Sequence, residues 1–239
     1  MKKYKSVLLA GCLSGLLFWV SGCQTSSKHL EEGRRLMREN KWKEAVAELN
    51  KAVEANPSNT EALNARGVAY FQLKDYQNAA LDYDQAIAAD SAVYLPFFNR
   101  AKLKLAQNDF EAAIRDFSKA TQLAPDSAEV FLNRGFVYAQ LHLPQQASAD
   151  FDKAIQLDND NPESYYVRGN LKLEQKDFGA AILDYEKAVG LRAKFPEAFF
   201  NMGLAQNMSG NREAACLHFK QAQKLGYADA KDAIEAFCK

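Results

Sequence analysis

The feature that most constrains this chain is a pattern of residues that occurs in six copies, each 34 residues after the one before. Small residues recur at this spacing in three rows, and a large apolar residue recurs in a fourth. The rows are, in order, Gly33, Gly67, Ala101, Gly135, Gly169 and Gly203; Ala45, Ala79, Ala113, Ala147, Ala181 and Ala215; Ala52, Ala86, Ala120, Ala154, Ala188 and Ala222; and Leu49, Tyr83, Phe117, Phe151, Tyr185 and Phe219. Four rows that stay in step over six copies indicate a helical solenoid.

One copy, residues 60–93, reads as two amphipathic helices with a turn expected at Lys74–Asp75. Ser58 and Glu61 have the spacing of a capping box at the start of the first helix. Gly and Ala let the two helix axes approach each other, and the aromatic residue fills the space beside them. Because one pair of helices has too little core to stand alone, neighbouring copies must stack and bury a continuous one. The sequence therefore predicts an all-α fold.

This pattern resembles the tetratricopeptide repeat family, which has a small residue at its eighth position, Ala at its twentieth and twenty-seventh, and an aromatic residue at its twenty-fourth. The predicted repeat region is 28–229, divided into copies 26–59, 60–93, 94–127, 128–161, 162–195 and 196–229. The resemblance implies a right-handed solenoid of six helix-turn-helix repeats, and apolar residues at helical spacing in 230–239 add a capping helix. It implies little about the partner, because the family is a scaffold.

Copies two to five depart from the family pattern, which usually has Leu at position seven. They carry Arg there and Asp at position twenty-three, and these two positions are expected to lie opposite each other across the helical hairpin. The predicted ion pairs are Arg66 with Asp82, Arg100 with Asp116, Arg134 with Asp150, and Arg168 with Asp184. Both partners change together in the end copies, to Glu32 and Glu48 in copy one and to Met202 and His218 in copy six. Structural pairs are the favoured interpretation, and a ligand site is the alternative.

The N-terminus carries a basic segment and a 15-residue apolar run, which is short for a membrane-spanning helix. The sequence Val20-Ser21-Gly22-Cys23 that follows resembles the lipobox of bacterial lipoproteins. The resemblance implies that residues 1–22 are a signal peptide that is removed, and that Cys23 becomes the acylated first residue. The alternatives are an ordinary secretory signal with an incidental cysteine, or an uncleaved anchor.

Gln24 follows the predicted lipidation site, and residues 23–27 are expected to be the acylated cysteine and a short tether that holds the solenoid close to the membrane surface. In enterobacterial lipoproteins an Asp at this position retains the protein in the inner membrane. Gln24 therefore implies the outer membrane, with the repeats on its periplasmic side. Removal of residues 1–22 takes away three lysines and no acid, which leaves a net charge of −3 and no basic patch for nucleic acid.

Two cysteines remain after Cys12 in the signal and Cys23 in the lipobox, and they are Cys216 and Cys238. Gly226 and Tyr227 lie midway between them, so a turn there would bring the two cysteines level on antiparallel helices. Since thiols oxidise outside the cytoplasm, we expect a Cys216–Cys238 disulfide. The alternative is a pair of buried free thiols.

No pattern in the sequence predicts an enzyme, a metal site or a cofactor. The three histidines lie in different copies, and the sequence has no HExxH, no CxxC, no Gly-rich phosphate loop and no nucleophile elbow. The carboxylates recur with the period, which marks them as part of the scaffold. We therefore expect a binding protein.

In tetratricopeptide solenoids the first helix of each repeat lines a concave groove, mainly through positions two, five, six, nine, twelve and thirteen. Here these positions hold apolar and aromatic residues edged by amides. The groove residues implied are Asn64, Phe98, Asn99, Leu132, Asn133, Phe136, Tyr166, Asn170, Phe200 and Asn201. The amides are similar to the asparagine ladder of the O-GlcNAc transferase repeats, although Val167 interrupts them. Packing between repeats is the alternative role for the aromatic residues.

These observations predict a membrane-anchored scaffold lipoprotein that binds an extended segment or a helix of a partner protein in its groove. Two lipoprotein groups of similar layout suggest partners: the pilotin-type lipoproteins of type IV pilus biogenesis, and the adaptors that gather peptidoglycan hydrolases and their proteases. One alternative is a structural subunit of an envelope complex that uses its convex face. Another is a module that binds glycan or peptidoglycan.

Overall fold

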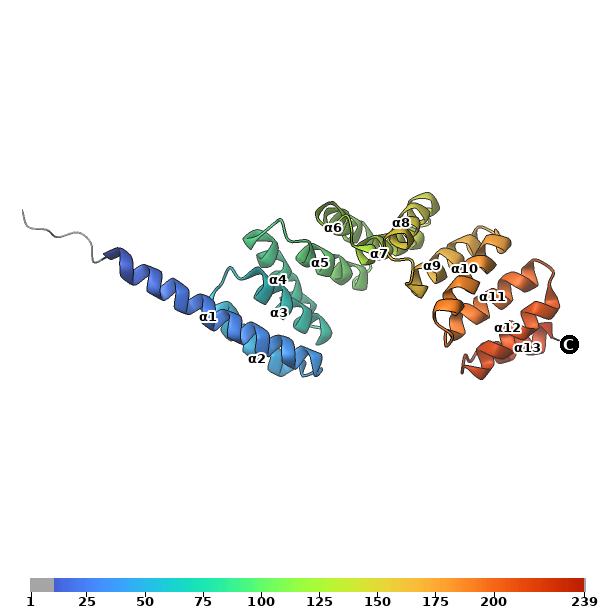
Figure 1. Ribbon diagram of the computed structural model, residues 1–239, viewed down its shortest axis with the longest axis horizontal. Helices are drawn as coiled ribbons and strands as arrows, with labels where there is room; N and C mark the ends of the chain where they lie inside the picture. Colours follow the sequence, from blue (N-terminus) through green and yellow to red (C-terminus); the bar gives the residue numbers. More distant parts are fainter. Residues whose placement is uncertain (1–10, 239) are drawn as a thin grey trace, which may run out of the picture. The chain divides into compact units, whose positions relative to one another are not determined.

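The computed structural model describes residues 11–238, with side chains from Gln24 onward (Figure 1). Within this range there are thirteen helices and no strand, and successive helices form helix-turn-helix pairs. The predicted all-α fold of six pairs and a capping helix is confirmed. The chain divides into two compact units, one up to Leu123 and one from Ala124.

The first unit contains three helix pairs. Their helices are α1 (Gly11–Arg38), α2 (Trp42–Ala55), α3 (Thr60–Gln72), α4 (Tyr76–Ala89), α5 (Tyr94–Ala106) and α6 (Phe110–Leu123). One core cluster of this unit gathers Leu49 and Ala52 of α2 with Ala62 and Ala65 of α3, so the second helix of one copy packs on the first helix of the next.

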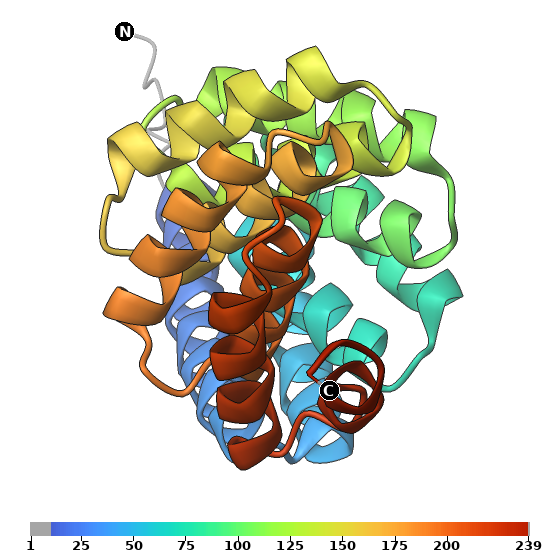
Figure 2. The ribbon, with the colours of Figure 1, turned by 90° about the vertical axis from the view of Figure 1, so that its right-hand side faces the viewer.

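The second unit contains three more pairs and the cap. Its helices are α7 (Ala128–Gln140), α8 (Pro144–Leu157), α9 (Pro162–Glu174), α10 (Phe178–Leu191), α11 (Pro196–Met208), α12 (Arg212–Lys224) and α13 (Ala230–Phe237). Figure 2 looks onto the C-terminal end, where α13 lies beside α12. There Ala233 of the cap joins Ala215 and Phe219 of α12 in one cluster.

The glycine row marks the close approach of the two helices in each pair. A Cβ added at Gly67 would lie 2.6 Å from Cε1 of Tyr83, and one added at Gly169 would lie 2.8 Å from Cε1 of Tyr185. Both distances are well inside van der Waals contact, and both tyrosines are almost completely buried. The glycine and the ring therefore form one packing unit that recurs with the period.

This packing predicts opposite effects for two Gly→Ala changes in the same helix pair. Gly169→Ala should lower the free energy of unfolding by about 1–3 kcal/mol, because the buried Tyr185 ring has to move. Gly179→Ala on α10 should raise it by about 0.5 kcal/mol, because nothing lies within 4 Å of the added methyl group and the unfolded chain loses freedom. Urea unfolding followed by circular dichroism measures both. Equal losses in the two variants would contradict the close approach.

The turns inside the pairs use a left-handed residue at one place in the repeat. Five of them are not glycine and have φ between 54° and 63°: Asn40, Lys74, Asn108, His142 and Lys176. Copy six has Gly210 at this place, with φ 87°. Lys74 lies in the predicted turn, which confirms its position, but its left-handed conformation was not predicted.

The structure corrects the expected start of α3. Asn59 is its N-cap, because its side-chain oxygen accepts a hydrogen bond from the backbone N–H of Ala62 at 3.1 Å. Ser58 instead donates through its hydroxyl to Asn56 Oδ1 within the preceding loop. The capping box predicted from Ser58 and Glu61 is therefore wrong.

The predicted tether, residues 23–27, lies within a helix in the structure. Helix α1 runs without a break from Gly11 to Arg38, so Gln24 to Ser27 are helical. Residues 1–10 of the predicted signal peptide, and Lys239 of the predicted cap, lie outside the described residues. None of the helices in the described part is long and apolar enough to cross a membrane.

Candidate protein-binding site

The four Arg–Asp pairs join the two helices of each inner copy. Arg66 donates from Nε and Nη2 to the two carboxylate oxygens of Asp82 at 2.8 and 2.6 Å. Arg168 does the same to Asp184 at 2.9 and 2.7 Å. The same bidentate contact joins Arg100 to Asp116 and Arg134 to Asp150. All four aspartates are buried.

These pairs hold the hairpins together and have little capacity left for a ligand. Each buried carboxylate accepts from its own arginine through both oxygens, and Asp184 also pairs with Lys172. The hydrogen bonds to Asp82 raise the pKa of the Arg66 guanidinium. Bidentate contacts of this kind are short and directional. The geometry supports the structural interpretation of the pairs.

Arg66, Arg100 and Arg168 also reach the preceding copy, which sequence reasoning missed. Arg66 Nη1 donates to Asn50 Oδ1 at 3.0 Å, and the same atom of Arg100 donates to Asp84 at 2.6 Å. Arg168 Nη1 contacts Asp152 at 2.6 Å. Each acceptor lies 16 residues before its arginine, as far before it as the buried aspartate lies after it. That symmetric spacing was the signal available in the sequence.

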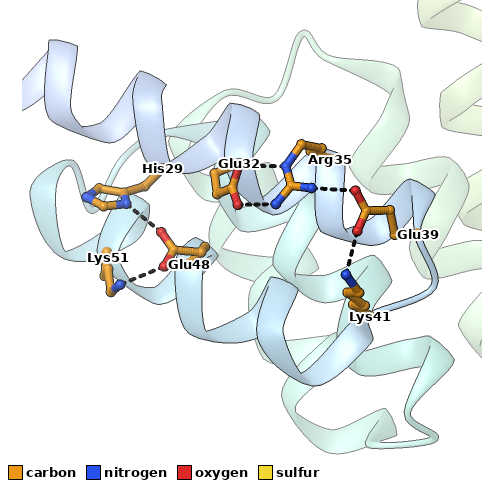
Figure 3. A network of polar contacts seen from close by, with 7 residues as sticks. All are labelled: His29, Glu32, Arg35, Glu39, Lys41, Glu48 and Lys51. Atoms are coloured by element: carbon orange, nitrogen blue, oxygen red, sulfur yellow. Dashed lines mark hydrogen bonds and ion pairs between the residues drawn. The ribbon is translucent and has the colours of Figure 1, made fainter.

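The end copies replace the pair in different ways. In copy one, Glu48 accepts hydrogen bonds from His29 Nδ1 at 2.7 Å and Lys51 Nζ at 2.6 Å, while Glu32 contacts Arg35. Figure 3 shows this network, which continues from Arg35 through Glu39 to Lys41. It covers the outer face of α1 and α2 with charged groups. A polar outer face is what a terminal repeat requires.

Copy six fills the same two places without an ion pair. Met202 is buried, and the His218 ring stacks on Phe199 with ring centroids 6.3 Å apart. Burial lowers the pKa of His218, so the imidazole is neutral at pH 7. An apolar residue and a neutral ring therefore replace the charged pair at this end.

In the first unit the predicted groove residues separate into two kinds. Asn64 and Asn99 are half-buried and joined, with Asn99 Nδ2 donating to Asn64 Oδ1 at 2.9 Å. Phe98 is only 4% exposed and packs edge-to-face on Phe117 at 5.7 Å. Its predicted place in a binding surface is wrong, because a partner cannot reach a ring in the core. The packing alternative holds for Phe98.

Helix α7 of the second unit carries three of the predicted groove residues, which differ in their exposure and contacts. Phe136 is 41% exposed. Leu132 packs against the cluster of Ala147 and Phe151. Asn133 Nδ2 donates to the carbonyl of Glu129 in its own helix at 2.8 Å, which leaves its carbonyl oxygen for other contacts.

Helices α9 and α11 hold the densest polar cluster among the predicted groove residues. Asn201 Nδ2 donates to Asn170 Oδ1 at 2.9 Å and to the Tyr166 hydroxyl at 3.3 Å. The hydroxyl of Tyr185 also donates to Asn170 Oδ1, at 2.9 Å. Burial raises the pKa of Tyr166, so the phenol stays protonated. The cluster fixes the orientation of both amides.

Phe200 is the last predicted groove residue and is half-buried. Its ring lies 4.8 Å from that of Tyr227 and 5.6 Å from that of Phe219. It therefore supports the end of the second unit and shows only part of its ring at the surface.

The paired amides keep hydrogen-bonding capacity for a ligand. An asparagine side chain has two N–H donors and an oxygen with two lone pairs. The contact between Asn64 and Asn99 uses one donor of Asn99 and one lone pair of Asn64. The amide hydrogens of Asn64 and the oxygen of Asn99 make no hydrogen bond to any described residue. Together they offer N–H donors and a carbonyl acceptor, which complement the acceptor and donor of a polypeptide backbone.

Within residues 24–238, no group of three His, Cys, Asp or Glu side chains could hold a metal ion. Cys216 and Cys238 form a disulfide that ties α13 to α12, with their Cα atoms 5.6 Å apart. The side chain of Cys23 lies outside the described part.

The repeated hairpins, the Gly–aromatic packing and the absence of strands in residues 11–238 define a helical repeat scaffold. Sequence profiles of the tetratricopeptide repeat match residues 30–93, 100–172 and 162–195, which together cover more than half of the chain. The chain belongs to the tetratricopeptide repeat family, whose domains are protein-interaction scaffolds.

Two solved structures resemble the whole repeat region. PilF of Pseudomonas aeruginosa aligns with a TM-score of 0.81 and 21% identity over 90% of this chain and 99% of that one. PilW, described as a widely conserved type IV pilus biogenesis factor, aligns with a TM-score of 0.80 and 19% identity over 88% of this chain and 98% of that one. At these identities the likeness shows the fold alone.

A curated relative shares only a few repeats with this chain. Anaphase-promoting complex subunit 3 of Schizosaccharomyces pombe is 30% identical over 93 residues, which is 39% of this chain and 14% of that protein. The chain therefore spans about a seventh of this relative's length.

Proposed function

We propose that this chain is a scaffold lipoprotein, anchored through Cys23 to the periplasmic side of the outer membrane. It holds a segment of a partner protein against the first helix of each repeat, here called the A helix, while the second helix of each repeat is called the B helix. It has no enzymatic activity in this proposal. The lipid fixes its location and the repeats recruit the partner. The lipobox residues Val20-Ser21-Gly22-Cys23 and the following Gln24 support the location.

The observation that carries the binding role is the pair of half-buried amides on neighbouring A helices. Asn64 and Asn99 keep a donor and an acceptor for a ligand, while their mutual hydrogen bond fixes their geometry. Amides held in this way can bind the backbone of an extended segment whatever its side chains. This suits a scaffold that recognises a chain conformation.

Type IV pilus assembly is the partner class that we favour over the peptidoglycan-hydrolase adaptors. The likeness to PilW, a pilus biogenesis factor, extends over almost all of both chains. The expected partner is a component of the pilus or of its outer-membrane pore.

Photo-crosslinking in cells tests this function. Crosslinking residues would replace Lys102 on α5 and Phe136 on α7, which are both exposed on A helices, and Leu81 on α4 as the matched site on a B helix. Capture of a pilus or pore component from the A-helix sites supports the proposal. Capture of a wall hydrolase from these sites would favour the adaptor role, and capture from Leu81 alone would remove the groove from the mechanism.

Removal of the paired amides should weaken partner binding without unfolding the protein. The double variant Asn64→Ala, Asn99→Ala loses about two neutral hydrogen bonds to the partner backbone, so its Kd should rise roughly tenfold to a hundredfold. Gln77→Ala, which removes an exposed amide from a B helix, should leave Kd unchanged. Fluorescence anisotropy with a labelled segment of the crosslinked partner measures both. Unchanged affinity in the double variant would contradict backbone recognition.

A second function is favoured by a separate observation. Leu81, Leu183 and Leu217 are 51%, 67% and 64% exposed, and they occupy the same repeat position on three B helices. A structural subunit of an envelope complex could bury them against its neighbours. Replacement of Leu183 and Leu217 by Gln would then release the protein from that complex, whereas changes at the amides would not.

A further inference from the structure

Ser26 fixes the start of the first repeat. Its side chain is completely buried, and its hydroxyl donates to the carbonyl of Ala52 in the last turn of α2 at 2.8 Å. The same hydroxyl accepts a hydrogen bond from Asn59 Nδ2 at 2.9 Å, and Asn59 in turn caps α3. One serine on α1 therefore joins the end of α2 and the beginning of α3.

This contact leaves almost no free chain between Ser26 and the proposed lipidation site. If cleavage occurs before Cys23, only Gln24 and Thr25 separate the acylated residue from the buried serine. Three helical steps from residue 23 to residue 26 span about 4.5 Å, and even a fully extended chain would span only about 10 Å. The first unit cannot move away from an anchor of this length.

From this geometry we infer that the first unit contacts the membrane through one defined end. That end is formed by residues 24–26 of α1 and by the loop of residues 56–59 that Ser26 ties to it. The inference rests on the proposed acylation of Cys23, and it deepens the proposed function because it fixes the orientation of the binding surface.

The chemistry of this end fits the headgroup layer of a phospholipid membrane. Lys28, Lys51, Glu54, Pro57, Ser58 and Glu61 are exposed there, Lys51 pairs with Glu48, and none of them is a large aliphatic or aromatic side chain that would insert into the acyl region. Lysines near a lipid surface pair with headgroup phosphates. The surface therefore contacts the headgroups, and only the acyl chains on Cys23 insert into the bilayer.

The consequence concerns the kind of partner. With this end at the membrane, Asn64, in the second turn of α3, lies close to the headgroups. The partner segment bound there must lie beside the membrane. It is therefore expected to belong to a protein embedded in the same membrane and not to one that spans the periplasm.

Depth-dependent quenching tests the orientation. The lipidated protein would be placed in vesicles of phosphatidylethanolamine and phosphatidylglycerol that contain nitroxide-labelled headgroups. Fluorophores would be attached at Ser58→Cys, in the tied loop, and at Lys43→Cys, at the opposite end of α2. These sites are about 20 Å apart along the helix. We expect quenching at position 58 to be several times stronger than at position 43.

A linker variant is the matched control. Twelve Gly and Ser residues inserted between Gln24 and Thr25 should abolish the difference between the two probes while leaving the protein on the vesicles. Equal quenching in the uninserted, acylated protein, or stronger quenching at position 43, would overturn the orientation.

The anchor itself is tested separately, by mass spectrometry of the mature N-terminus and by vesicle binding of Cys23→Ser. An unmodified Cys23, or full vesicle binding by Cys23→Ser, would refute the proposed acylation and with it the basis of the orientation. Acylation of Cys23 together with equal quenching would overturn the orientation alone.

Discussion

Asp184→Ala should lower the free energy of unfolding of the second unit by roughly 3–5 kcal/mol. Asp184 is 4% exposed and accepts two hydrogen bonds from Arg168. It also forms an ion pair with Lys172 at 2.7 Å. Its removal leaves Arg168 and Lys172 beside each other, 20% and 26% exposed, and only the exposed Asp152 still pairs with Arg168.

Asp152→Ala is the matched control, because it removes a carboxylate from the same guanidinium. The Asp152 side chain is 57% exposed, and an exposed ion pair contributes about 0.2–1 kcal/mol. Urea unfolding by circular dichroism, with hydrogen exchange at the amides of α9 and α10, would compare the two variants. Similar losses for Asp184→Ala and Asp152→Ala would show that burial of the pair has no special role.

Replacement of both members of the pair should be much less harmful than replacement of one. Copy six already has such a replacement. Met202 and His218 occupy the positions that correspond to Arg168 and Asp184, and no buried charge is left without a partner. The double variant Arg168→Met, Asp184→His should therefore recover more than half of the stability lost in Asp184→Ala. This follows from the general rule that a buried ion pair is near neutral when intact and costly when broken.

The 34-residue period was sufficient to predict the helix pairs because each row occupies one place in a hairpin. Gly67 and Tyr83, for example, must face each other in the same way in every copy, and the rows report that constraint directly. The Arg–Asp spacing predicted a contact across the hairpin for the same reason. Both features are contacts within one copy. Because the copies repeat, such contacts recur at the same spacing and can be recognised in the sequence.

Features without a residue signature could not be predicted. The left-handed turn position holds Asn, Lys or His in five copies, so no glycine marks it. The bonds from Arg100 to Asp84 and from Arg168 to Asp152 do have a signature, an acid 16 residues before the arginine, which was missed. Copy one holds Asn50 at this position instead of an acid, which obscured the pattern.

The candidate binding site was predicted only in part, because position in a repeat does not determine burial. Phe98 and Tyr166 occupy the same place in their copies, yet Phe98 is enclosed and Tyr166 is half-buried. Each ring packs on the aromatic residue at the same repeat position, Phe117 or Tyr185, so this contact does not account for the difference. The amides at this surface were identified because their chemistry, unlike that of an aromatic ring, is rarely needed in a core.

Removal of the Cys216–Cys238 disulfide should lower the free energy of unfolding by about 3 kcal/mol. The bridge closes a sequence separation of 22 residues, and in the chain-entropy account it limits the freedom of the unfolded chain. Its loss should act mainly on α13, an eight-residue helix that would be marginal by itself and depends on packing against α12.

The double variant Cys216→Ser, Cys238→Ser would be compared with wild type before and after reduction by dithiothreitol. We expect faster hydrogen exchange in α13, together with exposure of Phe219, in both the variant and the reduced protein. The helices of the first unit should be unaffected, because stability in a repeat protein is set by each repeat and its nearest neighbours. Unchanged exchange in α13 would mean that the contacts of Ala233 and Phe237 with α12 hold the cap without the bridge.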